Sequence, residues 1–372
     1  MKLLKVIADN YRNCVNQFTI DFVAKSKKTE EDKEYELQKI DEELYVFNTV
    51  AIVGKNASGK TSAIELLDCC YDILSTFRLD KVKFDCNGVK LQFYFYEEGY
   101  IYHYYTELKE AAEQVNRAVF VNQILRRKRY YKSKIKEIFN ESDWEEGFIH
   151  GELPEDVSIL FFVLKNFKLR EIYYGTEEDS LNNFDTNFSL IKKWDLSDAV
   201  VRSILKIFDE NVDNLIQLDE HKYELTYIGE KKELSDKDLD RVLSSGTIKG
   251  FDLYVTAYAS LKHGFDLVVD EIENHFHKSL VNNLICLYKD KTINRHNATL
   301  IFTTHYCEVL DLFNRSDNIW ITKSKEKVYI ENMYEKYDIR SELSKSKKFY
   351  ENVFGTGVDY EALMRLKGLL MQ

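Results

Sequence analysis

The sequence of 372 residues is poor in several features that would define other protein classes. It has one proline, Pro154, and no apolar run near the roughly 20 residues that a membrane helix needs. Its net charge of -11 argues against a protein that coats nucleic acid over its whole surface. Its six cysteines lack metal-ligand spacing, which favours reduced thiols: Cys14, Cys69, Cys70, Cys86, Cys286 and Cys307. The first five residues have a strand pattern rather than that of a signal peptide, so we expect a cytoplasmic protein without membrane contact.

The most informative segment that is present runs from Gly54 to Thr61 and reads Gly-Lys-Asn-Ala-Ser-Gly-Lys-Thr, a full match to the phosphate-binding loop. An apolar, β-prone run precedes it and a helical pattern follows it, which is the context that this loop needs. The glycines let backbone amides point inward, Lys60 reaches the outer phosphates, and the Thr61 hydroxyl can bind Mg²⁺. The predicted nucleotide-binding residues of this segment are Gly54, Lys55, Asn56, Ala57, Ser58, Gly59, Lys60, Thr61 and Ser62.

A second segment, residues 265–271, is a short apolar strand that ends in two carboxylates. We expect Asp270 to hold Mg²⁺, and Glu271 to orient and deprotonate the attacking water beside the γ-phosphate. The alternative is an ordinary buried strand that leaves the core through two charges. A helix-like stretch separates this strand from another that ends at His305, and such alternation favours a parallel sheet. Lys60, Asp270 and His305 should therefore lie along one rim.

Together with residues 2–12 and the segment Leu-Ser-Ser-Gly-Thr at positions 243–247, these motifs resemble the ABC-type ATPases of the SMC, RecF and OLD group. Within that group the sequence is most similar to compact bacterial AAA-labelled ATP-binding proteins of phage-defence and abortive-infection systems. The resemblance covers roughly residues 1–105 and 195–335 and is weak between them. It implies an α/β P-loop NTPase: an ABC-type head with a mixed or parallel sheet, an antiparallel β subdomain and a mainly helical inserted lobe.

The resemblance also implies individual roles. Lys60, Glu271 and His305 would be catalytic, with His305 as the switch histidine that contacts the γ-phosphate; the alternative for His305 is an ordinary loop residue. Ser244, Ser245 and Gly246 would form the signature loop that contacts the γ-phosphate held by the other subunit, although Ser244 could equally be a simple helix cap.

Further positions carry weaker implications. Arg12 matches a position that often touches the nucleotide, with a plain surface arginine as the alternative. Asn274 and His275 fall where a loop crosses the dimer interface, and Glu273 and His277 would be interface or supporting groups there. The glutamine that senses the γ-phosphate in this group is not identified, because Gln92 and Gln123 both lie in plausible regions.

The expected organisation has four parts. Residues 1–108 form the first part of the head, 109–195 an inserted lobe, 196–335 the second part of the head and 336–372 a helical tail. Residues 24–44 are highly charged and are predicted to form a mobile surface loop. Residues 81–108 alternate as paired antiparallel strands do, and strands at 318–322 and 327–331 are expected to close the sheet. No sustained heptad repeat indicates a long coiled-coil arm.

A basic strip with interleaved tyrosines stands against the acidic average. Its cations are Arg126, Arg127, Lys128, Arg129, Lys132, Lys134 and Lys136. It could contact nucleic acid, or it could be a solvated face or a docking surface for an acidic partner. The favoured function is an ATP-hydrolysing, Mg²⁺-dependent homodimer that serves as the regulatory subunit of a defence or toxin system with a separate effector, such as a nuclease. The alternative is a DNA-maintenance ATPase of the RecF or SMC kind.

Overall fold

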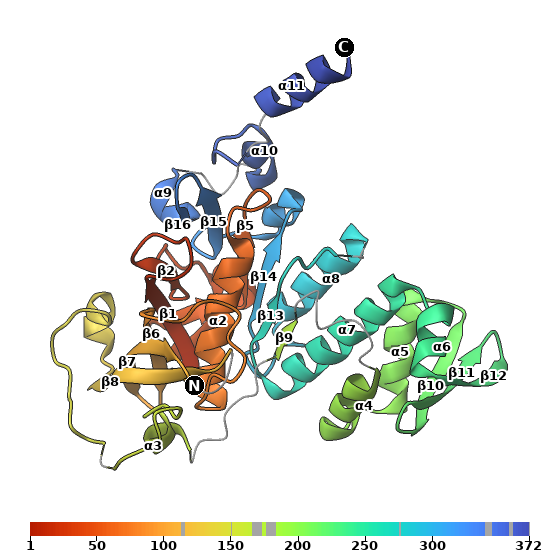
Figure 1. The fold of residues 1–372 in the computed structure, drawn as a ribbon, viewed down its shortest axis with the longest axis horizontal. Helices are drawn as coiled ribbons and strands as arrows, with labels where there is room; N and C mark the ends of the chain where they lie inside the picture. The colour runs from red at the N-terminus through yellow and green to blue at the C-terminus, as the bar shows by residue number, and fades with distance from the viewer. Residues whose placement is uncertain are drawn as a thin grey trace.

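The computed structural model describes residues 1–112, 116–149, 151–165, 173–175, 184–274, 277–338, 344–356 and 360–371. Its central sheet has the strand order β16-β15-β5-β14-β13-β9 (Figure 1). The strands are β5 (Thr49–Val53), β9 (Tyr173–Gly175), β13 (Leu267–Val269), β14 (Leu300–Thr304), β15 (Ile319–Ser324) and β16 (Val328–Asn332). The helices that cover it are α2 (Lys60–Ser75), α7 (Ser245–His263) and α8 (Lys278–Lys289). All neighbouring strands run parallel except the pair β15–β16 at one edge, which confirms the mixed, mainly parallel sheet and the two predicted closing strands.

The central strand β5 is buried on both faces, which explains its unbroken apolar run. Val50 and Ile52 pack into one hydrophobic cluster with α2. Ala51 and Val53 point the other way, into a second cluster that includes side chains of α7 and α8. Because each face of β5 packs into a separate hydrophobic cluster, the strand is a rigid support for the phosphate loop at its carboxyl end.

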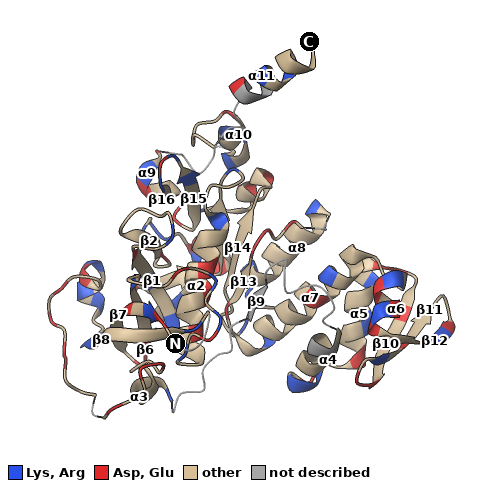
Figure 2. Ribbon diagram, viewed as in Figure 1, with Lys and Arg blue, Asp and Glu red and all other residues tan. Residues whose placement is uncertain are grey.

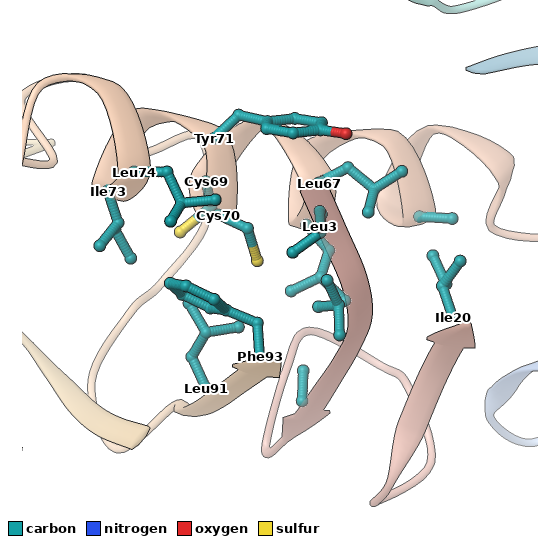
Figure 3. Close-up of a cluster of buried hydrophobic side chains, with 14 of the residues drawn as sticks. Leu3, Ile20, Leu67, Cys69, Cys70, Tyr71, Ile73, Leu74, Leu91 and Phe93 are labelled. Carbon is teal, nitrogen blue, oxygen red and sulfur yellow. The ribbon is translucent and has the colours of Figure 1, made fainter. Parts of the chain in front are cut away.

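The first cluster is closed by a five-stranded antiparallel sheet of order β2-β1-β6-β7-β8. Its strands are β1 (Lys2–Asp9), β2 (Phe18–Asp21), β6 (Lys90–Glu97), β7 (Tyr100–Glu110) and β8 (Ala118–Arg129). Figure 3 shows Leu67, Cys70 and Leu74 of α2 directed toward Leu3 and Phe93 of this sheet. The antiparallel subdomain is confirmed, and it also takes in residues 118–129, which the sequence analysis had placed in the inserted lobe.

A mainly helical lobe lies on the far side of α7 (Figure 1). Its elements are α4 (Phe184–Lys193), α5 (Asp198–Phe208), α6 (Asp236–Val242) and a three-stranded meander of β10 (Val212–Asp219), β11 (Lys222–Tyr227) and β12 (Glu230–Ser235). Phe184 and Phe188 of α4 stack near Phe251 of α7, so the lobe shares a core with this helix. The exact domain boundaries stay a prediction.

The prediction of a mobile loop at residues 24–44 is wrong. This segment forms α1 (Glu30–Tyr35) and a hairpin of β3 (Leu37–Asp41) and β4 (Leu44–Phe47). Its buried carboxylates have buried or nearly buried cationic partners far away in the sequence: Arg315 pairs with Asp32 at 3.0 Å, and Lys289 pairs with Glu36 at 2.7 Å. Two charges of this segment, Asp32 and Glu36, are therefore part of internal ion pairs that anchor it to the body.

The remaining described elements are short. They are η1 (Lys132–Glu137), α3 (Phe161–Leu164), η3 (Cys307–Leu312), α9 (Met333–Lys336), α10 (Lys345–Tyr350) and α11 (Tyr360–Leu370). The last two confirm a helical pattern in the tail, and α11 extends away from the body in Figure 1. All six cysteines are free thiols. Within the described ranges, no helix is both long enough and apolar enough to cross a membrane.

Candidate active site

The loop between β5 and α2 has the shape that a phosphate requires. Helix α2 starts at Lys60, and its N-cap residue Gly59 provides no side-chain hydrogen bond, so the first amides of this 16-residue helix are left to a ligand. Gly59 has a φ of +100°, and a Cβ there would lie 2.2 Å from Cγ1 of Val328. A Cβ on Gly54 would lie 2.4 Å from Oγ of Ser58. Both positions therefore need glycine for steric reasons.

Groups from distant parts of the chain hold this loop from behind. The Ser58 and Thr322 hydroxyls share a hydrogen bond of 2.7 Å, which ties the loop to β15. The buried Tyr11 donates its hydroxyl to the main-chain oxygen of Ser62 at 2.8 Å, which fixes the first turn of α2. The sequence analysis missed these supports, since a buried tyrosine and a threonine in a strand carry no local signal of such a contact.

An open cavity of about 820 Å³ lies in front of the loop, within the range of ligand sites. Its lining residues are Asn56, Ala57, Gly59, Lys60, Thr61, Ser62, Glu271, His305 and Val328. The cavity thus brings together the phosphate loop, the end of β13 and the end of β14, as the predicted rim requires.

Lys60 is 5% exposed and lies at the base of this cavity. Its ammonium group donates to the main-chain oxygens of Gly54 and Lys55, both at 3.2 Å, and lies 3.3 Å from Nδ1 of His305. Burial lowers the pKa of Lys60, although the nearby carboxylates of Glu271 and Asp270 oppose this effect. No carboxylate among the described residues forms a direct ion pair with this cation, so incoming phosphate oxygens would meet a partly desolvated charge.

The end of β13 places Asp270 beside the start of α2. Thr61 donates its hydroxyl to Oδ2 of Asp270 at 2.9 Å, and Thr303 donates to Oδ1. A hydroxyl and a carboxylate at one point are oxygen ligands of the type that Mg²⁺ takes, with water and substrate phosphates completing the shell. The described residues hold no cluster of three or more His, Cys, Asp or Glu that could bind a metal. Thr61 and Asp270 therefore fit the predicted Mg²⁺ site.

Glu271 is held in an unusual conformation at the edge of the cavity. Its φ is +49°, a strained value for a residue with a side chain, and its amide donates to Oγ1 of Thr303 at 2.6 Å. Its carboxylate lies 3.1 Å from Nε2 of His305 and accepts from Nδ2 of Asn274 at 2.8 Å. Burial alone would raise the pKa of Glu271, but the hydrogen bonds from Asn274 and His305 and the charge of Lys60 lower it. Glu271 is thus an ionised and oriented carboxylate.

Thr303 is a further residue whose role was not predicted from the sequence. Its single hydroxyl donates to Asp270 and accepts from the Glu271 amide, so it aligns both functional carboxylates. The side chain is fully buried at the end of β14, two residues before His305. A buried polar residue at the end of an apolar strand was the available signal.

The predicted signature residues lie away from this cavity in the same chain. Ser244 caps α7: its hydroxyl accepts from the Thr247 amide at 3.0 Å, as the simple capping alternative proposed. Ser245 is exposed and Gly246 half-buried at the start of this helix. The described lining of the cavity contains none of the three.

Arg12 and the two glutamines are also engaged elsewhere. Arg12 pairs with Glu65, one turn beyond Thr61 on α2, and donates to the main-chain oxygen of Lys83 at 2.9 Å. Gln92 lies 3.3 Å from His103 in the antiparallel sheet. Gln123 accepts from the amide of Ile159 at 2.9 Å.

None of these three residues lines the described part of the cavity, and the choice between the glutamines stays open. His277 caps α8 by accepting from the Ser279 amide, and His275 lies outside the described residues.

Three cations of the basic strip are paired with carboxylates of the segment that follows it. Arg126 pairs with Glu141 at 2.9 Å and with Glu146 at 3.0 Å. Arg127 forms a two-pronged pair with Glu145, and Lys134 pairs with Asp143. In Figure 2 basic and acidic positions lie close together around η1. A nucleic acid would have to displace these carboxylates to reach the strip.

Residues 50–311 match the protein family described as "AAA domain, putative AbiEii toxin, Type IV TA system". No curated protein matches the chain. Among solved structures, the SMC head domain from Thermotoga maritima is 13% identical with a TM-score of 0.42, and the match covers 89% of this chain and 99% of that one. A crystal structure of the SMC head bound to the C-winged helix domain of ScpA is 13% identical with a TM-score of 0.43, covering 91% of this chain and 100% of that one.

Proposed function

The chain belongs to this AAA family, and on that premise we propose that it is an ATPase that binds ATP with Mg²⁺ and hydrolyses it to ADP and phosphate. The observation that carries the proposal is the convergence of Lys60, Glu271 and His305, from three separate strand ends, around one cavity, with Asp270 bonded to the Thr61 hydroxyl in its lining. The open amides of α2 and the desolvated Lys60 favour the β- and γ-phosphates. Mg²⁺, held by Thr61 and Asp270, would neutralise charge on these phosphates.

Glu271 is the proposed general base. Its lowered pKa keeps it ionised at neutral pH, and the hydrogen bonds from Asn274 and His305 fix both of its oxygens. An ionised carboxylate at the cavity edge can orient a water molecule and accept its proton as the water attacks the γ-phosphate. His305 lies between Lys60 and Glu271, a position from which its ring can contact the transferred phosphoryl group.

We further propose an ABC-type homodimer in which each ATP lies between two chains. The cavity is open in a single chain, and Ser244 and Ser245 at the start of α7 are exposed rather than used in its lining. Amides at the start of a 19-residue helix form a second anion site of the kind that could cover the γ-phosphate of the other subunit. A two-fold arrangement would complete both sites by the same contact.

The proposed biological role is regulation of a separate effector, such as a nuclease or toxin, in an anti-phage defence system. It is supported by the family match and by the absence, within the described residues, of metal-binding clusters that could serve a second, nuclease-like chemistry. Closure around ATP and opening after hydrolysis would switch the effector between two states. The alternative, direct action on DNA, is less favoured because three cations of the basic strip, Arg126, Arg127 and Lys134, already have carboxylate partners.

The proposal is tested with Glu271→Gln, which keeps the size of the side chain and removes the base. We expect ATP to bind, hydrolysis to fall by at least about 100-fold, and a dimer to accumulate with ATP but not with ADP. Light scattering after size exclusion measures the dimer, and phosphate release measures the rate. Wild-type protein that neither binds nor cleaves ATP would overturn the proposal.

A further inference from the structure

Hydrogen bonds continue to link the segment after β13 with the end of β14 beyond the point where strand pairing stops. The last paired residues are Val269 and Phe302. After them, the Glu271 amide donates to the Thr303 hydroxyl and the Ile272 amide donates to the Thr303 carbonyl at 3.0 Å. The last link of this series is the main-chain amide of His305, which donates to Oε1 of Glu273.

This last link decides where the histidine lies. Strand β14 ends at Thr304, so the amide of His305 has no ladder partner and takes the carboxylate instead. With its backbone held there, the ring reaches Lys60 through Nδ1 and Glu271 through Nε2. A shift of the backbone would break both ring contacts at once.

The environment of the Glu273 carboxylate is not one that packing alone would favour. The residue is 7% exposed, and its second oxygen, Oε2, is buried without a hydrogen-bond partner among the described residues. A buried, half-satisfied carboxylate is costly, so a neutral side chain would be the stabler choice if the position served packing only. The other oxygen, Oε1, accepts from the His305 amide.

We propose that Glu273 is a positioning residue for ATP hydrolysis: it fixes the backbone of His305 and thereby aligns the ring with Lys60 and Glu271. The sequence resemblance places Glu273 only among interface or supporting groups. The inference rests on the proposed ATPase function, because its effect on rate appears only if His305 acts in hydrolysis. It does not make Glu273 a catalytic residue, since Glu273 is not among the described residues that line the cavity and acts on the main-chain amide of His305.

Two variants separate this role from a general effect of negative charge near Lys60. Glu273→Ala removes both charge and acceptor, whereas Glu273→Gln removes the charge and keeps an amide oxygen that can accept from His305. We expect Glu273→Ala to lower kcat roughly 10- to 100-fold with KM for ATP within about threefold of wild type, as for a misaligned catalytic group. Glu273→Gln should keep most of the rate. A charge effect would instead change both variants alike, mainly in KM.

A double-mutant cycle with His305→Ala tests the route of the effect. If Glu273 acts through His305, Glu273→Ala should cause no further loss of kcat in the His305→Ala background. Additive losses would overturn the proposal. Glu308→Ala, which removes a carboxylate just beyond His305 on η3, is the matched control and should leave the rate at the wild-type level.

Hydrogen exchange gives a readout that does not depend on activity. A peptide spanning residues 303–308 should exchange faster in Glu273→Ala and at the wild-type rate in Glu273→Gln, because only the alanine variant frees the His305 amide. Equal exchange in all three proteins would overturn the inference even if ATP is cleaved. If the wild type does not cleave ATP, the proposed function fails, and the exchange data still decide whether Glu273 holds the histidine.

Discussion

Two regions of this chain present cations where phosphate could bind, and they differ in what those cations already contact. At the rim of the central sheet, Lys60 donates to two main-chain oxygens and lies next to a ring nitrogen. In the basic strip, Arg126, Arg127 and Lys134 each pair with a carboxylate from residues 141–146. A phosphate that binds at the rim gains a charge interaction with Lys60. A phosphate that binds at these cations of the strip must first displace a carboxylate from its ion pair.

The origin of the partners also differs. At the rim, Thr61 meets Asp270 across 209 positions of sequence and Lys60 meets His305 across 245. In the strip, every named carboxylate partner lies within 20 positions of its cation. The polar groups of the rim thus come from distant parts of the chain, whereas the named pairs of the strip are local.

The largest expected difference between the regions comes from Lys60→Ala. Removing this buried charge should weaken ATP binding by about 2–3 kcal/mol, or roughly 30- to 150-fold, because charge-assisted contacts to phosphate are lost. Lys128→Ala is the matched control, since Lys128 also donates to main-chain oxygens, those of Glu137 and Asn140. Calorimetry with a non-hydrolysable ATP analogue should show wild-type affinity for the control. Equal losses in both variants would erase the distinction between the regions.

A second large effect should follow from Gly59→Ala. The added methyl group would meet Val328 at 2.2 Å in a left-handed backbone, so the loop must deform and ATP affinity should fall by about tenfold or more. Gly88→Ala shares the left-handed backbone, with a φ of +72°, but has open space around it. This control should lose up to about 1–2 kcal/mol of stability without a change in ATP binding. Normal ATP affinity in Gly59→Ala would show that the loop tolerates a side chain.

A smaller, pH-dependent effect should separate Lys60 from the exposed cations. Burial lowers the pKa of Lys60 in the empty site, and bound phosphates would raise it again. The affinity for ATP is then greatest below the lowered pKa and declines as the pH rises through it, with proton uptake on binding. Calorimetry above about pH 8, where the phosphates are fully ionised, should detect this uptake in wild type and not in Lys60→Ala. Proton release by the wild type, or proton uptake that persists in Lys60→Ala, would contradict the assignment of this uptake to Lys60.

The smallest effect is expected in the basic strip itself. Replacing Arg126, Arg127 and Arg129 by glutamine should leave nucleic-acid retention at the background level of the wild type, because carboxylates already pair with Arg126 and Arg127. Mobility-shift assays between low and physiological salt measure it. Salt-sensitive binding by the wild type that is lost in the triple variant would instead favour direct action on DNA.

Much of the rim could be predicted because its signals are local. The glycine loop, the strand before it and the helix after it are contiguous, and Asp270, Glu271 and His305 each directly follow an apolar strand. Parallel strands place their carboxyl ends on one edge, so the meeting of these residues followed from topology. The supports were less visible: Tyr11 and Thr303 look like ordinary side chains until their partners are known, and the resemblance placed Glu273 only among interface or supporting groups.

The prediction for residues 24–44 failed for a related reason. A run of charges usually marks a solvated segment, and nothing local distinguishes Glu36 from its exposed neighbours. Its partners, Lys289 and the Asn314 amide, lie more than 250 positions away. The same limit applies to the basic strip, where the tyrosines and cations were visible but the compensating role of residues 141–146 was not.

The measurement that tests the account most directly is ATP hydrolysis by mixed variants. Lys60→Ala disables phosphate binding by the loop of one chain, and Gly246→Arg blocks the start of α7 in the other. Each variant alone should be nearly inactive. If the sites are shared, a mixed dimer pairs one intact phosphate loop with one intact helix start, so mixing should restore hydrolysis at about half of the sites in the heterodimers. Heterodimers that form and stay inactive would contradict an ATP site built from two chains.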